Sequence, residues 1–148
     1  MKFLVLNGPN INMLGLREPE LYGTAGYADL QKLVQERAAA LQVEIKFLQS
    51  NHEGDLVDAI QQAYWEGMDG IILNAAAYTH TSVAVLDALQ AVRLPVVEVH
   101  ITDPDRREEF RRVNFVRPAA VLTIAGHGLQ GYVEALDFLV ERVGHLCK

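Results

Sequence analysis

Five short runs of apolar residues are spaced along the chain and predict buried β-strands. These runs are rich in Val, Ile and Leu and mostly lack strict alternation of apolar and polar positions. That pattern is typical of strands covered on both faces. The runs span Phe3–Leu6, Val43–Leu48, Gly70–Asn74, Pro95–Val99 and Ala120–Ala125.

Apolar residues between and after these runs recur at the spacing of one helix face. The four helical stripes comprise Leu30, Leu33, Val34, Ala38 and Leu41; Leu56, Ile60, Ala63 and Tyr64; Val85, Leu89 and Val92; and Tyr132, Leu136, Leu139, Val140 and Val143. Asp55 and Ser82 stand near two of the expected helix starts and are capping candidates. The alternation of strands and helices predicts an α/β fold, with a five-stranded parallel sheet and helices on both faces. We expect the flavodoxin-like strand order 2-1-3-4-5.

Size and composition narrow the class of protein. The 148 residues are half hydrophobic, which favours one soluble domain over residues 1–148. The formal net charge of -6 argues against nucleic-acid binding but leaves an anionic substrate open, because one arginine in a cleft outweighs the total. Cys147 is the single cysteine, so no internal disulfide can form. With no apolar run of membrane-spanning length and no charged leader, a cytoplasmic protein without membrane association is expected.

A long connection follows the first predicted strand and carries Arg17, Pro19 and Tyr22. Connections of this length are more often functional than idle. A tyrosine held near a guanidinium loses its proton more easily than its ordinary pKa of about 10 implies. The pair is therefore a candidate base that needs no metal or cofactor. The alternative is a solvated loop charge beside a packed aromatic ring.

Polar side chains gather where the other predicted strands end. Asn7 and Asn10 follow the first strand, the segment 74–82 follows the third, and the segment 98–103 follows the fourth. Ligands bind beyond the carboxyl ends of the strands in open parallel sheets. Amides, hydroxyls and imidazoles at this edge therefore predict a binding site there.

Two histidines and one acidic residue near this edge can each be interpreted as structural or surface residues in place of functional ones. His100 is either a core histidine at a strand end or a general acid or base whose charge and tautomer Glu98 sets. His80 is either a loop histidine satisfied by its neighbours or a substrate contact. Asp87, in an otherwise apolar helix, is most simply on a solvated face.

The segment 106–112 reads as a short solvated helix of mixed charge, from which one arginine could still turn toward the cleft. His80, His100 and His127 could converge as a metal site. No HxH or HExxH spacing supports that reading, and surroundings rich in Asn, Tyr and Arg suit hydrogen bonding better. We therefore expect no metal and no cofactor.

Taken together, these residues resemble the type II 3-dehydroquinate dehydratases over nearly the whole chain. The resemblance rests on separate blocks in the family's order: LNGPNxNxLGxREPxxYG at the start, Gln49–Gly54, Asn74 with Tyr78–Ser82, Glu98–Ile101, Arg107–Arg111 and Gly131-Tyr132. It implies a flavodoxin-like fold and a homododecamer of four trimers. It also implies the loss of water from 3-dehydroquinate by anti elimination through an enolate, in the shikimate pathway, without metal or cofactor.

The resemblance assigns roles to individual positions. Tyr22 resembles the base that takes the C2 proton while ionised beside Arg17, and Asn10 the residue that holds a water against the enolate oxygen. His100 resembles the acid that protonates the leaving hydroxyl, with Glu98 orienting it. Six more positions would bind substrate: Asn74 with the backbone amides of Ile101 and Thr102 at the carboxylate, His80 and Arg111 at ring hydroxyls, and Asp87 from a neighbouring subunit.

The chain departs from the family pattern at a few positions. Thr102-Asp103 stands where Ser-Asn is common, and Asp103 is expected to add negative charge near a bound anion. Leu86 and His127 replace a common arginine and an apolar residue.

A flavodoxin-like binding, signalling or scaffold module without catalysis is the alternative. A phosphoacceptor module would need acidic residues after the first and third strands, where Asn7 and Asn74 stand, and a flavin module would need a Ser/Thr- and Gly-rich phosphate loop.

Overall fold

The computed structural model describes residues 1–16, 20 and 24–146. Arg17 and Tyr22 of the predicted site lie outside the described residues.

Five strands form one parallel sheet in the order β2-β1-β3-β4-β5, which confirms the predicted fold class and strand order. The strands are β1 (Lys2–Asn7), β2 (Glu44–Gln49), β3 (Gly70–Asn74), β4 (Val96–His100) and β5 (Leu122–Ala125). In register across β1 and β3, Asn7 lies opposite Asn74. The carboxyl ends of the central strands therefore meet at one edge of the sheet.

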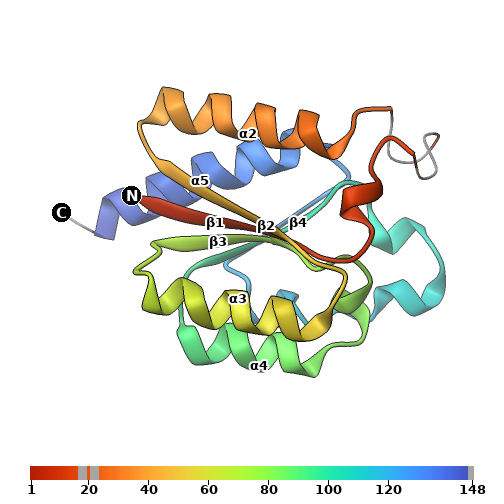
Figure 1. Ribbon diagram of the computed structural model, residues 1–148. Coiled ribbons are helices and arrows are strands. Elements are labelled where there is room, and N and C mark those ends of the chain that lie inside the picture. Colours follow the sequence, from red (N-terminus) through yellow and green to blue (C-terminus); the bar gives the residue numbers. More distant parts are fainter. Residues whose placement is uncertain (17–19, 21–23, 147–148) are drawn as a thin grey trace.

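Helices cover both faces of this sheet, as predicted. α2 (Tyr27–Leu41) and α5 (Gln130–Leu146) lie on one face, and α3 (Glu53–Trp65) and α4 (Val83–Val92) lie on the other (Figure 1). Phe3 and Val5 of β1 belong to the hydrophobic cluster under α2 and α5, whereas Leu4 and Leu6 belong to the one under α3 and α4. Each fully buried side chain of this kind stabilises the fold by roughly 1.5–3 kcal/mol. Because β1 is buried on both faces, its sequence does not alternate between apolar and polar residues.

Burial on both faces was predicted for all five strands and is wrong for the outer two. β1, β3 and β4 are buried along almost their whole length, but β2 and β5 are mostly half-buried because they form the edges of the sheet. Strand β4 begins at Val96 rather than Pro95 and extends to His100. His100 is therefore part of the sheet itself.

One capping prediction is confirmed and one is wrong. Ser82 caps α4, and its Oγ accepts a hydrogen bond of 3.0 Å from the N–H of Val85. Asp55 lies inside the first turn of α3, where its carboxylate accepts the hydroxyl of Ser50 at 2.6 Å, while His52 holds the cap position.

Tyr64 was predicted to be on the apolar stripe of α3 but is exposed. Its ring packs edge-on against the exposed Trp65, with centroids 5.0 Å apart. Met68, just after the helix, is buried in the cluster instead.

Short 3₁₀ helices follow the central strands: η1 (Ile11–Met13), η2 (Ala76–His80), η3 (Pro104–Arg106) and η4 (Glu109–Arg112), with η5 (Arg117–Ala119) before β5. Gly8 brings the first of these segments against the third strand. Its N–H donates to the carbonyl of Asn74 at 2.8 Å, and a Cβ at Gly8 would collide with the carbonyl oxygen of Ala75. Only a glycine allows this approach.

Candidate active site

A cavity of about 120 Å³ opens at the carboxyl edge of the sheet, where a ligand site was expected. Its walls come from the segments after β1, β3 and β4 and from η3 and η4. The lining residues are Pro9, Asn10, Ile11, Leu14, Asn74, Ala76, Ala77, His80, His100, Ile101, Thr102, Pro104, Arg107 and Arg111. The structure thus brings together seven of the predicted site residues: Asn10, Asn74, His80, His100, Ile101, Thr102 and Arg111.

His100 and Glu98 form a buried pair on β4. The Nε2 of His100 lies 2.7 Å from the Oε1 of Glu98, and both residues point to the same face of the strand because they are two positions apart. A carboxylate at this distance holds Nε2 as the protonated nitrogen. The Nδ1 of His100 is then the ring atom left for proton exchange with a ligand in the cavity.

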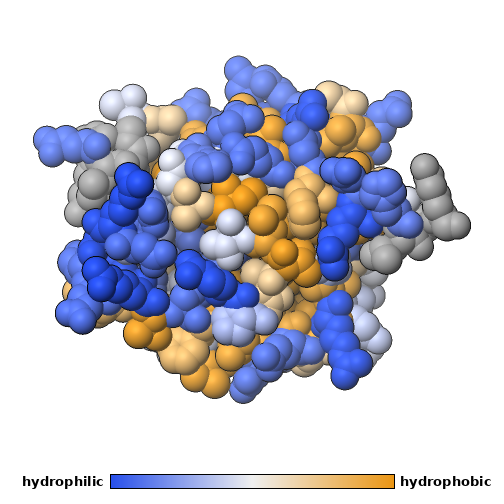
Figure 2. All heavy atoms as spheres, turned by 180° about the vertical axis from the view of Figure 1, so that it is seen from behind, coloured by the Kyte–Doolittle hydropathy of each residue, from blue (hydrophilic) through white to orange (hydrophobic). Residues whose placement is uncertain are grey.

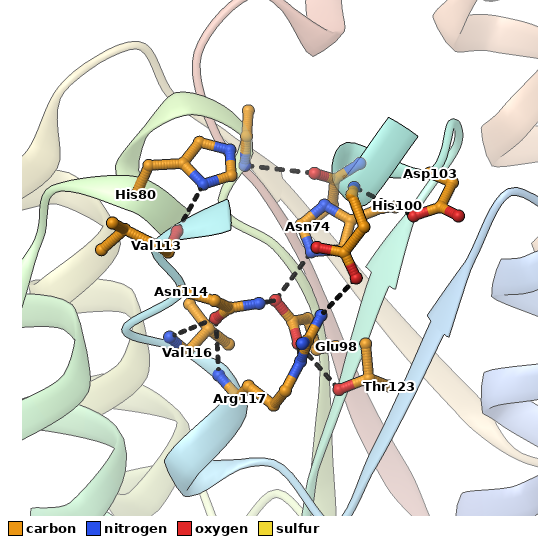
Figure 3. A network of polar contacts seen from close by, with 12 residues as sticks. Asn74, His80, Glu98, His100, Asp103, Val113, Asn114, Val116, Arg117 and Thr123 are labelled. Atoms are coloured by element: carbon orange, nitrogen blue, oxygen red, sulfur yellow. Dashed lines mark hydrogen bonds and ion pairs between the residues drawn. The ribbon is translucent and has the colours of Figure 1, made fainter. Parts of the chain in front are cut away.

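Three further side chains converge on the carboxylate of Glu98 (Figure 3). Asn114 donates to Oε1 at 2.6 Å, Thr123 donates to Oε2 at 2.8 Å, and the guanidinium of Arg117 lies 3.9 Å from Oε2. Burial raises the pKa of Glu98, but the hydrogen bonds from His100, Thr123 and Asn114 and the charge of His100 together hold that pKa below its ordinary value. Glu98 is therefore ionised although it is fully buried.

Asn114 and Thr123 were not predicted as site residues. Asn114 lies between η4 and η5, where its own Oδ1 accepts the N–H groups of Val116 and Arg117. Neither residue belongs to a motif, and their sequence distance from Glu98 hides the contact. The sequence carries no signal that would have found them.

His80 is held by the backbone carbonyl of Val113, 2.7 Å from its Nδ1 (Figure 3). A carbonyl only accepts, so Nδ1 carries the proton and Nε2 is the acceptor of the neutral ring. Burial lowers the pKa of His80, and the nearby charges of His100 and Arg111 lower it further, against the opposing effect of the Val113 bond. A neutral His80 that lines the cavity is suited to accept a hydrogen bond from a ligand hydroxyl.

Two arginines face the cavity from the segment predicted to be a solvated helix. Most of the segment is exposed, as predicted, but it forms parts of two 3₁₀ helices, η3 and η4, in place of one helix. The exceptions to its exposure are the side chains of Arg107 and Arg111, which are only 16% and 20% exposed. Arg111 donates to Glu108 at 2.6 Å. One arginine of the segment was expected to turn toward the cleft, and Arg111 does so. Arg107 also lines the cavity but was not singled out from the sequence. These cations suit an anionic ligand in spite of the negative net charge.

The loop that carries Asn10 is held by the last residue of β2 and by a residue just after it. The backbone of Asn10 is in the left-handed region, with φ of 69°, which asparagine tolerates better than most residues. Its N–H donates to the Oδ1 of Asn51 at 3.0 Å, and the amide of Gln49 donates to that oxygen and to the carbonyl of Gly8, each at 3.2 Å. The segment after β2 therefore shapes the loop that carries Asn10.

Comparison with known proteins agrees with this geometry. Residues 1–140 match the family model described as "Dehydroquinase class II". The 3-dehydroquinate dehydratases of Caldicellulosiruptor bescii and Dinoroseobacter shibae are 47% and 52% identical over 140 and 137 residues; these matches cover 95% and 93% of this chain and 97% and 91% of the relatives. The chain belongs to the class II dehydroquinase family. The crystal structure of type II dehydroquinase from Butyrivibrio crossotus superposes with a TM-score of 0.92 at 46% identity, covering 94% of this chain and 97% of that one.

One departure from the class II dehydroquinase pattern, Asp103, lies between two residues of the cavity wall, Thr102 and Pro104. Asp103 was expected to place negative charge near a bound anion, but it is not among the lining residues. Its Oδ1 instead caps η3 by accepting the N–H of Asp105 at 3.0 Å, and its Oδ2 lies 3.4 Å from Arg106. The carboxylate is thus held in the cap, and the effect of its negative charge on a bound anion stays a prediction.

His127 and Asp87 also lie away from the cavity of this class II dehydroquinase. His127 is half exposed and lies 2.8 Å from Glu134, so it does not meet His80 and His100. No group of three or more His, Cys, Asp or Glu side chains that could hold a metal occurs in residues 1–16, 20 and 24–146. Asp87 is exposed on α4. In the described part of the chain, no helix is both long and apolar enough to cross a membrane.

Proposed function

We infer that this chain is a 3-dehydroquinate dehydratase, which removes water from 3-dehydroquinate to give 3-dehydroshikimate in the shikimate pathway. The substrate is a cyclic β-hydroxyketone that carries a carboxylate. The observation that carries the inference is the buried Glu98–His100 pair at a cavity lined by asparagines and arginines. The family and its 3-dehydroquinate dehydratase relatives support the same activity.

The departing hydroxide needs a proton, and His100 is the proposed donor. Protonated at both nitrogens, its imidazolium is stabilised by the ionised Glu98 and delivers the Nδ1 proton to the C1 hydroxyl, which leaves as water. Glu98 holds the ring in place and itself stays ionised. The neutral imidazole is then reprotonated before the next turnover.

The carboxylate of the substrate is proposed to bind at Asn74 and at the backbone amides of Ile101 and Thr102, all on the cavity wall. The neutral His80 and Arg111 would hold ring hydroxyls. These contacts are equal in the ground state and the transition state, so they set affinity more than rate.

The proton at C2 is proposed to go to Tyr22, ionised beside Arg17. Its electron pair moves into the ring carbonyl and forms an enolate. Asn10, at the cavity wall, would hold a water against that developing oxyanion. The enolate then re-forms the carbonyl as the C1 hydroxyl leaves, which completes the elimination.

A turnover assay tests the proposal directly. The product is an enone, so its ultraviolet absorbance rises as 3-dehydroquinate is consumed. The purified chain is expected to turn over this substrate, and a His100→Ala variant should be strongly impaired under the same conditions. Binding of 3-dehydroquinate with no product would instead identify a module without catalysis.

The same assay checks the expectation that no metal takes part. Activity is expected to survive exhaustive treatment with a chelator, because the proposed acid and base are both side chains and neither needs a metal to shift its proton. Loss of activity that a divalent metal restores would contradict this mechanism.

We propose that the chain works as a homo-oligomer, a homododecamer built of trimers, in which Asp87 reaches a neighbouring site. The exposed position of Asp87 agrees with this role. The large apolar side chains that are exposed on the described part of the chain include Val83, Phe110, Val113 and Val121. The face behind the view of Figure 1 shows a hydrophobic area within hydrophilic surroundings (Figure 2), of the kind that subunit contacts cover.

Analytical ultracentrifugation is expected to show one large, closed assembly. Asp87→Asn should lower turnover without changing the sedimentation of that assembly, whereas Asp58→Asn, on α3, should leave both unchanged. A monomer with full activity would refute the assembly and the role of Asp87 together.

Residues 1–148 are proposed to act as one catalytic domain in the cytoplasm, with no nucleic-acid or membrane partner. The acidic net charge and the single Cys147 agree with this assignment.

A further inference from the structure

Two buried asparagines end adjacent strands at the carboxyl edge of the sheet. Asn7 of β1 and Asn74 of β3 are opposite one another in register and are 0% and 3% exposed. Leaving a buried amide group unpaired costs about 1–3 kcal/mol. Both polar atoms of Asn74 have partners among the described residues, whereas Asn7 is paired through its Oδ1 alone and its Nδ2 has none there. Only Asn74 of the two lines the cavity.

Tyr132, in the first turn of α5, joins the two amides. Its hydroxyl donates to the Oδ1 of Asn7 at 2.6 Å and accepts from the Nδ2 of Asn74 at 2.9 Å. Burial raises the pKa of Tyr132 far above its ordinary value, so the phenol keeps its proton and can serve as donor and acceptor at once.

Gly131 lets the start of α5 come close to the sheet. A Cβ at Gly131 would lie 3.3 Å from the Cγ2 of Ile124 and 3.4 Å from the Cγ1 of Val99. The position of the phenol is therefore set by tight packing of the helix on β4 and β5.

The contacts of Asn74 fix the direction of its amide. Its Oδ1 accepts the N–H of Ala76 at 3.1 Å, and one hydrogen of its Nδ2 goes to Tyr132. If the amide were turned over, its nitrogen would face the N–H of Ala76, donor against donor. The remaining hydrogen on Nδ2 is thus the group that Asn74 has left for a ligand.

We propose that Tyr132 is a positioning residue that keeps the N–H of Asn74, and not its oxygen, directed at the carboxylate of the substrate. The inference rests on the dehydratase activity proposed above and adds the residue that determines anion recognition. A turned amide would present a carbonyl oxygen to the carboxylate and repel it. Without the phenol hydroxyl, Asn74 loses one of the two contacts that fix its direction.

The test is Tyr132→Phe, which keeps the ring and removes the hydroxyl. KM for 3-dehydroquinate is expected to rise about 10- to 100-fold, the range for a lost hydrogen bond to a charged group, while kcat changes far less. Binding of an unreactive cyclohexane carboxylate such as quinate should weaken by a similar factor, whereas binding of its neutral carboxamide should not. A purely structural defect would weaken both ligands equally.

Two further variants sharpen the result. Once Asn74→Ala is present, adding Tyr132→Phe should change KM no further, because both act through one group. Tyr78→Phe is the matched control: it removes a phenol that donates to the carbonyl of Asn51 at 3.0 Å on the same edge of the sheet, and it should not alter the preference for carboxylate over carboxamide.

Circular dichroism shows whether each variant is folded. If Tyr132→Phe does not fold, Asn7→Ala carries the same test, since it removes the acceptor that fixes the phenol hydrogen, and it should shift KM in the same direction. A folded Tyr132→Phe with unchanged KM, with equal losses for both ligands, or with a loss additive to that of Asn74→Ala would overturn the positioning role. Failure of the wild-type chain to turn over 3-dehydroquinate would instead refute the proposed function.

Discussion

Replacing Tyr22 with phenylalanine is expected to lower kcat by several orders of magnitude while substrate still binds. The reason is that Tyr22 is the proposed base, and a general base that acts directly on carbon contributes on the order of 100- to 10,000-fold or more to the rate. Phenylalanine keeps the ring and removes the ionisable oxygen. Steady-state kinetics with 3-dehydroquinate measure kcat, and equilibrium binding of quinate measures retained affinity.

Arg17→Ala is the companion to this variant, because the guanidinium is proposed to favour the ionised phenol. Without that charge the pKa of Tyr22 returns toward its ordinary value of about 10, so the phenol is mostly protonated at neutral pH. Residual turnover of Arg17→Ala should therefore rise toward high pH, and Tyr22→Phe should lack that rise. The two losses should be strongly non-additive, since both disable one unit. Near-normal turnover of Tyr22→Phe would place the base elsewhere.

Glu98→Gln is expected to reduce kcat by about 100- to 10,000-fold, the contribution of a general acid. The substitution keeps the shape of the side chain but removes the charge that stabilises the imidazolium of His100. The new amide nitrogen would also face Asn114 or Thr123, which both donate to the carboxylate in the wild type. The steady-state rate with 3-dehydroquinate is the measurement.

A matched control for this variant is Asp137→Asn. This substitution also replaces a carboxylate with an amide. Asp137 pairs with Arg37 at 2.7 Å, and neither residue lines the cavity. The substitution should leave kcat unchanged. If Glu98→Gln retained wild-type kcat, proton transfer by His100 would not depend on its carboxylate partner, and the proposed acid would be wrong.

The parts of the fold that could be predicted are those in which local sequence and tertiary environment agree. β1 and β3 are buried on both faces, so their runs of Val, Ile and Leu gave the correct elements. The predicted strand order placed β2 at the edge of the sheet, but its incomplete burial was not predicted: Glu44 is exposed and the rest of the strand is half-buried, because no further strand of the described residues lies beyond it.

The site residues likewise fall into those that could be predicted from the sequence and those that could not. His100 and Glu98 were predictable because two residues of one strand share a face whatever surrounds them. Asn114 and Tyr132 contact the site across long stretches of sequence, and a polar residue in a loop or a tyrosine in a helix stripe carries no local sign of that contact. The capping role of Asp103 was not predicted either, because the backbone N–H of Asp105 that its carboxylate accepts is placed only by the turn into η3.

The glycine at position 8 has a consequence for how this protein can evolve. No side chain fits between it and Ala75, so the spacing between the loop that carries Asn10 and the strand end that carries Asn74 cannot be altered by substitution there. Substitutions at this position are therefore not tolerated, even though Gly8 need not touch a ligand. The distance between these two parts of the cavity wall is set by a backbone contact, so substitutions that change the size of the ligand have to fall at other lining positions, such as those of η2, η3 and η4.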